Sequence, residues 1–195
     1  MGRAQFDQTG FLAAARALIA ERGPQAVTVD SVAARMGAPK GSFYYRFASR
    51  DALLGEVWLK TVLAYQGGFV AAIEAGDGLS AALHTPAWAR RYLDDARLLM
   101  LYSRHDFVHG PWPTELRRGV ADQADRFEGC LRSFARGAFG RAGRGEMRRA
   151  TFVLAEAPIA AVKPHLERRE PPPPLVDELI SKTYRAIVGG GADAR

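Results

Sequence analysis

The residues best suited to chemistry in this chain form a short polar run that could bind a polyanion. The run offers an ammonium group, a guanidinium and three hydroxyls, on Lys40, Ser42, Tyr44, Tyr45 and Arg46. Such groups donate hydrogen bonds to phosphate oxygens, and an arginine can also pair with a guanine edge through two hydrogen bonds. Gly41 within the run has no side chain and would let a phosphate approach the backbone. We therefore interpret this run as a nucleic-acid-binding surface.

Two short helices joined by a tight turn are predicted to position this run. The first helix, 28–36, has an apolar face and begins at Thr28, a residue type that commonly caps helix N-termini. Gly37 ends it, and the second helix follows over 39–47. In that second helix Phe43 and Phe47 are four residues apart, so we assign both to the core. This spacing is that of a helix-turn-helix, whose second helix enters the DNA major groove.

The distribution of charge agrees with this interpretation. The chain has 195 residues and a formal net charge of +6. Residues 1–50 hold seven basic and three acidic side chains, so about a quarter of the chain carries two-thirds of the positive surplus. A clustered surplus of this kind favours a polyanion partner. Hydrophobic residues at 48% and charged residues at 25% exclude a disordered or collagen-like chain.

The rest of the chain is also predicted to be helical, which makes the fold all-α. An amphipathic helix is expected over 6–22, and Ser49 is a suitable N-cap for a longer helix over 49–73. The later segments keep a helical period and show no hairpin signal. Further helices are expected near 79–93, 95–105, 114–138, 146–167 and 175–188.

Residues 6–58 resemble the N-terminal domain of TetR-family transcriptional regulators. The resemblance rests on Ala26-Val27-Thr28-Val29-Asp30-Ser31-Val32-Ala33, on Lys40-Gly41-Ser42-Phe43-Tyr44-Tyr45-Arg46-Phe47, and on Ser49-Arg50-Asp51-Ala52-Leu53-Leu54. It implies a helix-turn-helix DNA-binding domain over 1–48. It also implies a larger helical ligand-binding and dimerisation domain over 49–195, with the helix 49–73 linking the two.

The resemblance also implies roles for individual residues toward double-stranded operator DNA. Thr28 and Tyr44 would bind phosphates, and Arg50 would neutralise one. Tyr45 and Arg46 would face the groove, with Arg46 as the best candidate to read a guanine. The other implied DNA contacts are Lys40, Gly41 and Ser42. The role of the acidic Asp30, at a position where some members carry a basic residue, stays open.

The C-terminal part offers aromatic and apolar side chains for a pocket that would bind a small hydrophobic or aromatic effector. Each of them could equally belong to the core. The candidates are Tyr65, Phe69, Trp88, Tyr92, Met100, Tyr102, His105, Phe107, Trp112 and Phe127.

Two apolar stripes near the C-terminus are candidates for a homodimer interface built as a four-helix bundle with a second copy. Burial against their own domain is the alternative. The candidate interface residues are Phe152, Ala155, Ile159, Leu175, Leu179 and Tyr184.

Other classes of site find little support in the sequence. His105 and His109 could share a metal, but no third spaced ligand is visible, so we expect neither a metal nor a cofactor. The one cysteine, Cys130, reads as a small apolar residue and indicates a reducing, cytoplasmic setting. Neither a signal peptide nor a membrane span is expected. Because the nucleophile-elbow and P-loop patterns are missing, we expect no enzyme.

These observations together predict a sequence-specific DNA-binding regulator. The expected mechanism is a repressor that a small effector releases from a palindromic operator. The alternative is a DNA-binding regulator or architectural protein that has no effector.

Overall fold

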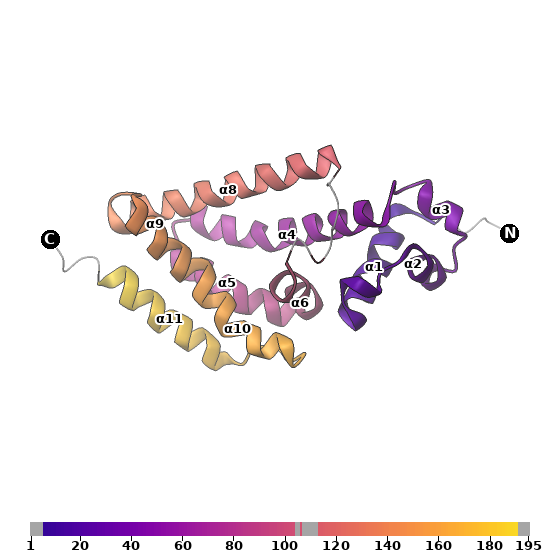
Figure 1. Ribbon diagram of the computed structural model, residues 1–195. Coiled ribbons are helices and arrows are strands. Elements are labelled where there is room, and N and C mark those ends of the chain that lie inside the picture. Colours follow the sequence, from indigo (N-terminus) through magenta and orange to yellow (C-terminus); the bar gives the residue numbers. More distant parts are fainter. Residues whose placement is uncertain (1–5, 104–105, 107–112, 191–195) are drawn as a thin grey trace. The chain divides into compact units, whose positions relative to one another are not determined.

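The computed structural model describes residues 6–103, 106 and 113–190 and separates into two compact units (Figure 1). The first unit comprises Met1–Val62 and Tyr102–Val120, and the second comprises Leu63–Leu101 and Ala121–Arg195. Every regular element within the described residues is a helix, so the prediction of an all-α fold is confirmed.

The first unit is built around a small aromatic core. The Phe11 ring meets the Phe43 ring edge-on at 5.8 Å between centroids and the Phe47 ring at 6.2 Å, and all three side chains are buried. The assignment of Phe43 and Phe47 to the core is thereby confirmed. The helices that supply and cover this core are α1 (Gln8–Arg22), the 3₁₀ turn η1 (Pro24–Ala26), α2 (Val29–Met36), α3 (Lys40–Tyr44) and the first half of α4 (Arg50–Glu74).

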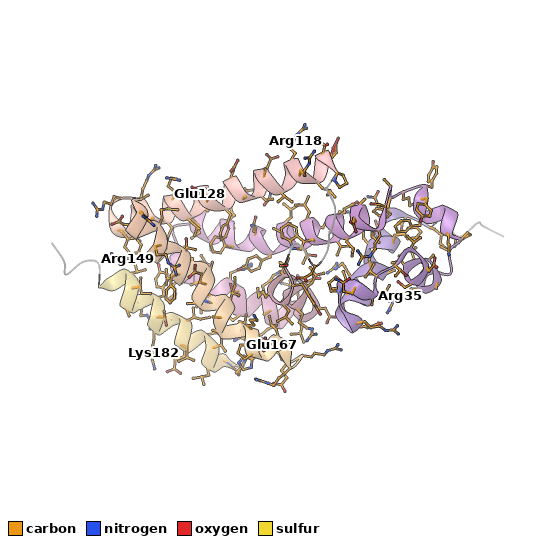
Figure 2. All side chains as sticks on the ribbon, in the orientation of Figure 1. Arg35, Arg118, Glu128, Arg149, Glu167 and Lys182 are labelled. Carbon is orange, nitrogen blue, oxygen red and sulfur yellow. The ribbon has the colours of Figure 1, made fainter. Side chains whose placement is uncertain are left out.

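The second unit packs its helices around a larger apolar core. Phe69, Trp88, Leu154 and Leu166 are among its buried side chains. Charged residues such as Glu128 and Lys182 lie on its outside (Figure 2). Besides the second half of α4, it contains α5 (Gly78–Arg91), α6 (Leu93–Leu101), most of α8 (Thr114–Phe139), α9 (Arg144–Thr151), the π-helical turn η2 (Phe152–Glu156), α10 (Ala157–Glu167) and α11 (Pro174–Gly189).

The C-terminal helices pack on α5, which contacts both α10 and α11 (Figure 1). Arg90 on α5 anchors the start of α11 by donating to the carbonyl oxygen of Pro172 at 2.7 Å and pairing with Asp177 at 2.9 Å. The predicted helix near 146–167 contains one π-helical turn, which ends two residues before Pro158. Pro158 has no N–H to donate to the carbonyl one turn earlier, which is a physical reason for irregular bonding there.

None of the helices within the described ranges combines the length and the apolar character needed to cross a bilayer.

Candidate nucleic-acid interface

The turn between α2 and α3 is set by local capping interactions. Thr28 Oγ1 accepts a hydrogen bond from the backbone N–H of Ser31 at 3.0 Å, and Ser31 Oγ accepts from that of Thr28 at 2.8 Å. Thr28 is therefore the N-cap of α2, as predicted, in a reciprocal box whose partner Ser31 the sequence analysis did not identify. Gly37 ends α2 in the left-handed conformation with φ of 62°, which costs glycine least. The chain thus turns within a few residues and begins α3 at Lys40.

The two faces of α3 differ sharply in exposure. The structure ends this helix at Tyr44, so the predicted helix 39–47 is shorter than expected and residues 45–47 lie beyond it. Phe47 still donates its N–H to the carbonyl oxygen of Phe43 at 2.9 Å. Phe43 and Phe47 are buried, whereas Tyr44 and Tyr45 are 60% and 85% exposed. Aromatic side chains are costly to leave in water, and large exposed ones typically mark a contact surface. The structure therefore brings the predicted tyrosines together on an open surface.

Two other predicted contacts, Arg46 just after α3 and Gly41 within it, lie on or beside this surface. Arg46 has its guanidinium carbon 5.4 Å from the centre of the Tyr45 ring, and its Nη1 lies 3.5 Å from the carbonyl oxygen of Ser42. At Gly41 an added Cβ would meet no protein atom within 4 Å. Internal packing therefore gives no reason for a glycine there, and the space outside Gly41 is open to a binding partner.

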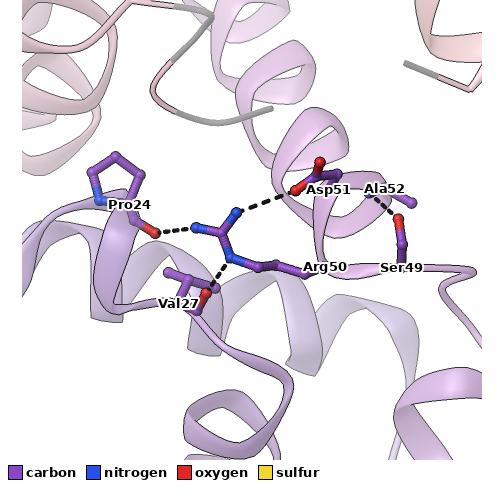
Figure 3. A network of polar contacts seen from close by, with 6 residues as sticks. All are labelled: Pro24, Val27, Ser49, Arg50, Asp51 and Ala52. Carbon is purple, nitrogen blue, oxygen red and sulfur yellow. Dashed lines mark hydrogen bonds and ion pairs between the residues drawn. The ribbon is translucent and has the colours of Figure 1, made fainter. Parts of the chain in front are cut away.

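Arg50, predicted to neutralise a phosphate, has several partners inside the protein (Figure 3). Its Nε donates to the carbonyl oxygen of Val27 at 2.5 Å, and its Nη2 donates to that of Pro24 at 2.9 Å. Its Nη1 pairs with Asp51 at 3.1 Å. Ser49 caps α4, as predicted, by accepting from the backbone N–H of Ala52. Arg50 therefore fastens the first residue of α4 to the link between α1 and α2, and a phosphate contact stays a prediction.

Asp30, whose role the sequence left open, forms an ion pair with Lys40. The distance between Oδ1 of Asp30 and Nζ of Lys40 is 2.6 Å. The hydrogen bond to this carboxylate, together with its negative charge, raises the pKa of the Lys40 ammonium. The pair connects the first turn of α2 to the first residue of α3, ten residues further along the chain. No short-range sequence motif predicts it.

The second unit brings several predicted pocket residues into contact. The Tyr65 and Trp88 rings lie 5.2 Å apart, the Trp88 and Tyr92 rings 5.8 Å apart, and Phe69 contacts Phe127 at 5.1 Å. All of these except Tyr92, and Met100 with them, belong to or pack against the core of this unit. Cys130 also packs against this core, and burial raises the pKa of its thiol. The ring contacts thus form two groups, Tyr65–Trp88–Tyr92 and Phe69–Phe127, and the role of these residues in a pocket stays untested.

Polar side chains that the sequence did not point to lie beside Tyr65. Tyr65 Oη and Thr85 Oγ1 share a hydrogen bond at 2.8 Å, and His84 Nε2 lies 2.7 Å from the carbonyl oxygen of Tyr65. Burial lowers the pKa of His84 and raises that of Tyr65. Within the described part of the chain, Gln66 Oε1 and Arg97 Nε are buried without a hydrogen-bond partner. Buried polar atoms of this kind are commonly completed by an ordered water or a bound ligand.

Other candidates are placed elsewhere. Tyr102 belongs to the first unit, where its hydroxyl lies beside Gly23 at the end of α1. His105, Phe107 and Trp112 lie outside the described residues. Among the residues that are described, no group of three or more His, Cys, Asp or Glu side chains could hold a metal.

The candidate dimer residues divide into two groups. Leu175 and Leu179, one turn apart on α11, are 58% and 51% exposed, and Phe152 is also exposed. Ala155 and Ile159 are half-buried. Tyr184 is half-buried too, and its ring lies 6.2 Å from that of Phe134 in the same unit. The exposed leucines are therefore accessible to a second chain, whereas Tyr184 packs against the core of its own unit.

Comparison with known proteins supports the resemblance seen in the sequence. Residues 11–57 match the family of bacterial regulatory proteins, tetR family. No curated protein is significantly similar to the chain in sequence.

Similar solved structures cover nearly the whole chain. A tetR-family regulator from Shewanella sp. PV-4 has a TM-score of 0.67 at 15% identity and covers 94% of this chain and 96% of its own. FadR from Bacillus subtilis in complex with stearoyl-CoA has a TM-score of 0.61 at 14% identity, with 94% and 99% covered. A tetR-family regulator from Mesorhizobium loti MAFF303099 has a TM-score of 0.60 at 15% identity, with 98% and 97% covered.

At these identities the solved structures show a shared fold. Residues 11–57, which hold the helix-turn-helix, therefore match the family of bacterial regulatory proteins, tetR family, and the chain as a whole has the fold of tetR-family transcription regulators.

Proposed function

We propose that the protein is a homodimeric repressor that binds a palindromic operator through α3 and leaves it when a small hydrophobic effector binds. The observation that carries this proposal is the surface of α3. It presents two highly exposed tyrosines beside Lys40 and Arg46, with open space outside Gly41.

The proposed contacts divide into phosphate and base contacts. Thr28, Tyr44 and Gly41 would lie against phosphates, which position the protein without reading sequence. Ser42, Tyr45 and Arg46 would face the groove, where Arg46 can leave its place over Tyr45 and pair with a guanine edge. Each good bidentate pair discriminates against the wrong base by about 1–3 kcal/mol.

A second copy of the chain is needed for tight binding, because one recognition helix reads only a half-site. The exposed leucines of α11 and the exposed Phe152 offer an apolar surface to this second copy. Arg90 holds the start of α11 in place and so keeps that surface ordered. A two-fold dimer would match a palindromic operator.

The effector would bind among the aromatic side chains of the second unit. Support comes from the ring contacts around Trp88 and from the buried oxygen of Gln66, which lacks a partner among the described residues. FadR, which shares the fold, binds stearoyl-CoA. Because α4 contributes residues to both units, it would link the DNA-binding domain at 1–48 to the effector domain at 49–195. The effector would act by binding the DNA-free state more tightly.

Two experiments test the proposal. Duplexes selected from a random pool by the purified protein should contain a palindrome with half-sites about one helical turn apart. Thermal-shift measurements with stearoyl-CoA and a panel of small aromatic compounds should find a stabilising ligand, and that ligand should release the selected duplex. Selective DNA binding without any stabilising ligand would favour the alternative of a regulator that has no effector.

A further inference from the structure

On the proposed DNA-binding surface, one basic side chain forms an ion pair with a carboxylate of the protein itself. The Asp30–Lys40 ion pair is short, at 2.6 Å, yet the two side chains are 67% and 64% exposed. Lys40 begins α3, and the exposed Tyr44 and Tyr45, at its end and just after it, form the proposed contact surface. Asp30 follows Thr28, the proposed phosphate contact, by two positions. The pair therefore lies in water where the DNA backbone would approach.

Asp30 contributes little to the stability of the fold. Exposed ion pairs contribute little to stability, because solvent screens them and ordering two side chains costs entropy. The N-terminus of α2 favours an acidic residue, but its backbone is already capped by Thr28 and Ser31. An acidic side chain at this place repels phosphates and competes with them for Lys40. Its effect should therefore be seen in binding more than in folding.

We propose that Asp30 is a specificity-determining residue that holds Lys40 in the free protein and thereby weakens binding to DNA of any sequence. This inference rests on the proposed function, in which α3 binds DNA. Non-specific binding depends almost entirely on phosphate neutralisation, so removing one cation per subunit weakens it most. Operator binding has base contacts as well, which do not depend on Lys40, so the loss of this cation weakens it by a smaller factor.

The test compares the wild-type protein with Asp30→Asn on two duplexes, the one selected from the random pool and a scrambled duplex of the same composition. Fluorescence anisotropy over a series of salt concentrations gives the affinity and its salt dependence. Each additional phosphate contact steepens the plot of log affinity against log salt by about 0.9, so a dimer should gain about 1.8. We expect affinity for the scrambled duplex to rise by roughly tenfold or more, and affinity for the selected duplex by a smaller factor.

Two further variants separate this effect from simpler ones. Glu21→Gln removes another exposed carboxylate paired with an arginine, Arg35, at 2.5 Å, and changes net charge by the same amount. It links α1 to the last turn of α2 and should leave the salt dependence unchanged. In a Lys40→Met background, Asp30→Asn should have little effect on the salt dependence, because no ammonium remains to be freed.

Four results would overturn the inference. The first is unchanged binding of Asp30→Asn to the scrambled duplex. The second is an equal effect of Glu21→Gln, which would show a dependence on net charge alone. A loss of affinity confined to the selected duplex would mean that Asp30 accepts a hydrogen bond from a base. If the wild-type protein bound neither duplex, the proposed function itself would fail, and this inference with it.

Discussion

Replacing Arg50 tests whether this residue stabilises the first unit or binds DNA. Its guanidinium donates to the carbonyl oxygens of Val27 and Pro24, in the link between α1 and α2. Arg50→Met keeps most of the aliphatic stem and removes both donors. Hydrogen bonds from charged groups are worth about 1.5–3 kcal/mol each, and Arg50 is partly exposed, so we expect a loss of about 2–4 kcal/mol in the stability of the first unit.

Hydrogen exchange followed by mass spectrometry is a suitable assay, because it reports on the first unit separately. Where amides exchange through opening of this unit, a loss of that size speeds exchange by roughly 30- to 900-fold. The effect should concentrate in peptides covering 24–47 and spare those of α10 and α11. Arg50→Lys is the matched control for charge. It retains the positive charge but cannot reach both carbonyl oxygens with one planar group, so it should lose much of the same protection.

The salt dependence of DNA binding tests the alternative, in which Arg50 contacts a phosphate. If Arg50 neutralises a phosphate in each subunit, Arg50→Met should flatten the plot of log affinity against log salt by about 1.8 for a dimer. Unchanged hydrogen exchange together with this flattening would refute the structural role derived from Figure 3.

Four further predictions concern other parts of the molecule. Tyr44→Phe should weaken binding to all duplexes alike, while Arg46→Ala should also relax base preference by about 1–3 kcal/mol at one position, as competition between single-base variants of the selected duplex will show. Gly41→Ala should keep or raise thermal stability, since helices favour alanine by about 1 kcal/mol, but should weaken DNA binding in anisotropy titrations; unchanged binding would place the DNA elsewhere. Leu179→Asp should give a monomer mass in light scattering, and a persisting dimer would exclude this face of α11. Because burial lowers the pKa of His84, its neutral form is favoured in the fold; stability should be complete above its ordinary pKa of 6.5 and fall as pH drops below it, and His84→Asn should reduce this dependence in thermal melts.

The elements of the first unit could be predicted from the sequence because their signals are local. Thr28 and Ser49 act as caps through atoms three residues away, and Gly37 ends its helix through its own backbone conformation. Phe43 and Phe47 are four residues apart and both are buried, as predicted, although α3 ends at Tyr44 and Phe47 lies just beyond it. Interactions of this range depend only on the order of residues along the chain.

Other features were decided by tertiary structure, because they join residues that the sequence separates. Arg50 was predicted as a phosphate contact, but its partners lie 23 and 26 residues earlier, so only the fold could show that its donors are engaged. The Asp30–Lys40 pair depends on the direction in which the turn places α3 after α2. Likewise, an apolar stripe on α11 does not reveal which of its residues face the chain's own core. Packing against α5 and α10 buries Val176 and Ile180 and leaves Leu175 and Leu179 in solvent.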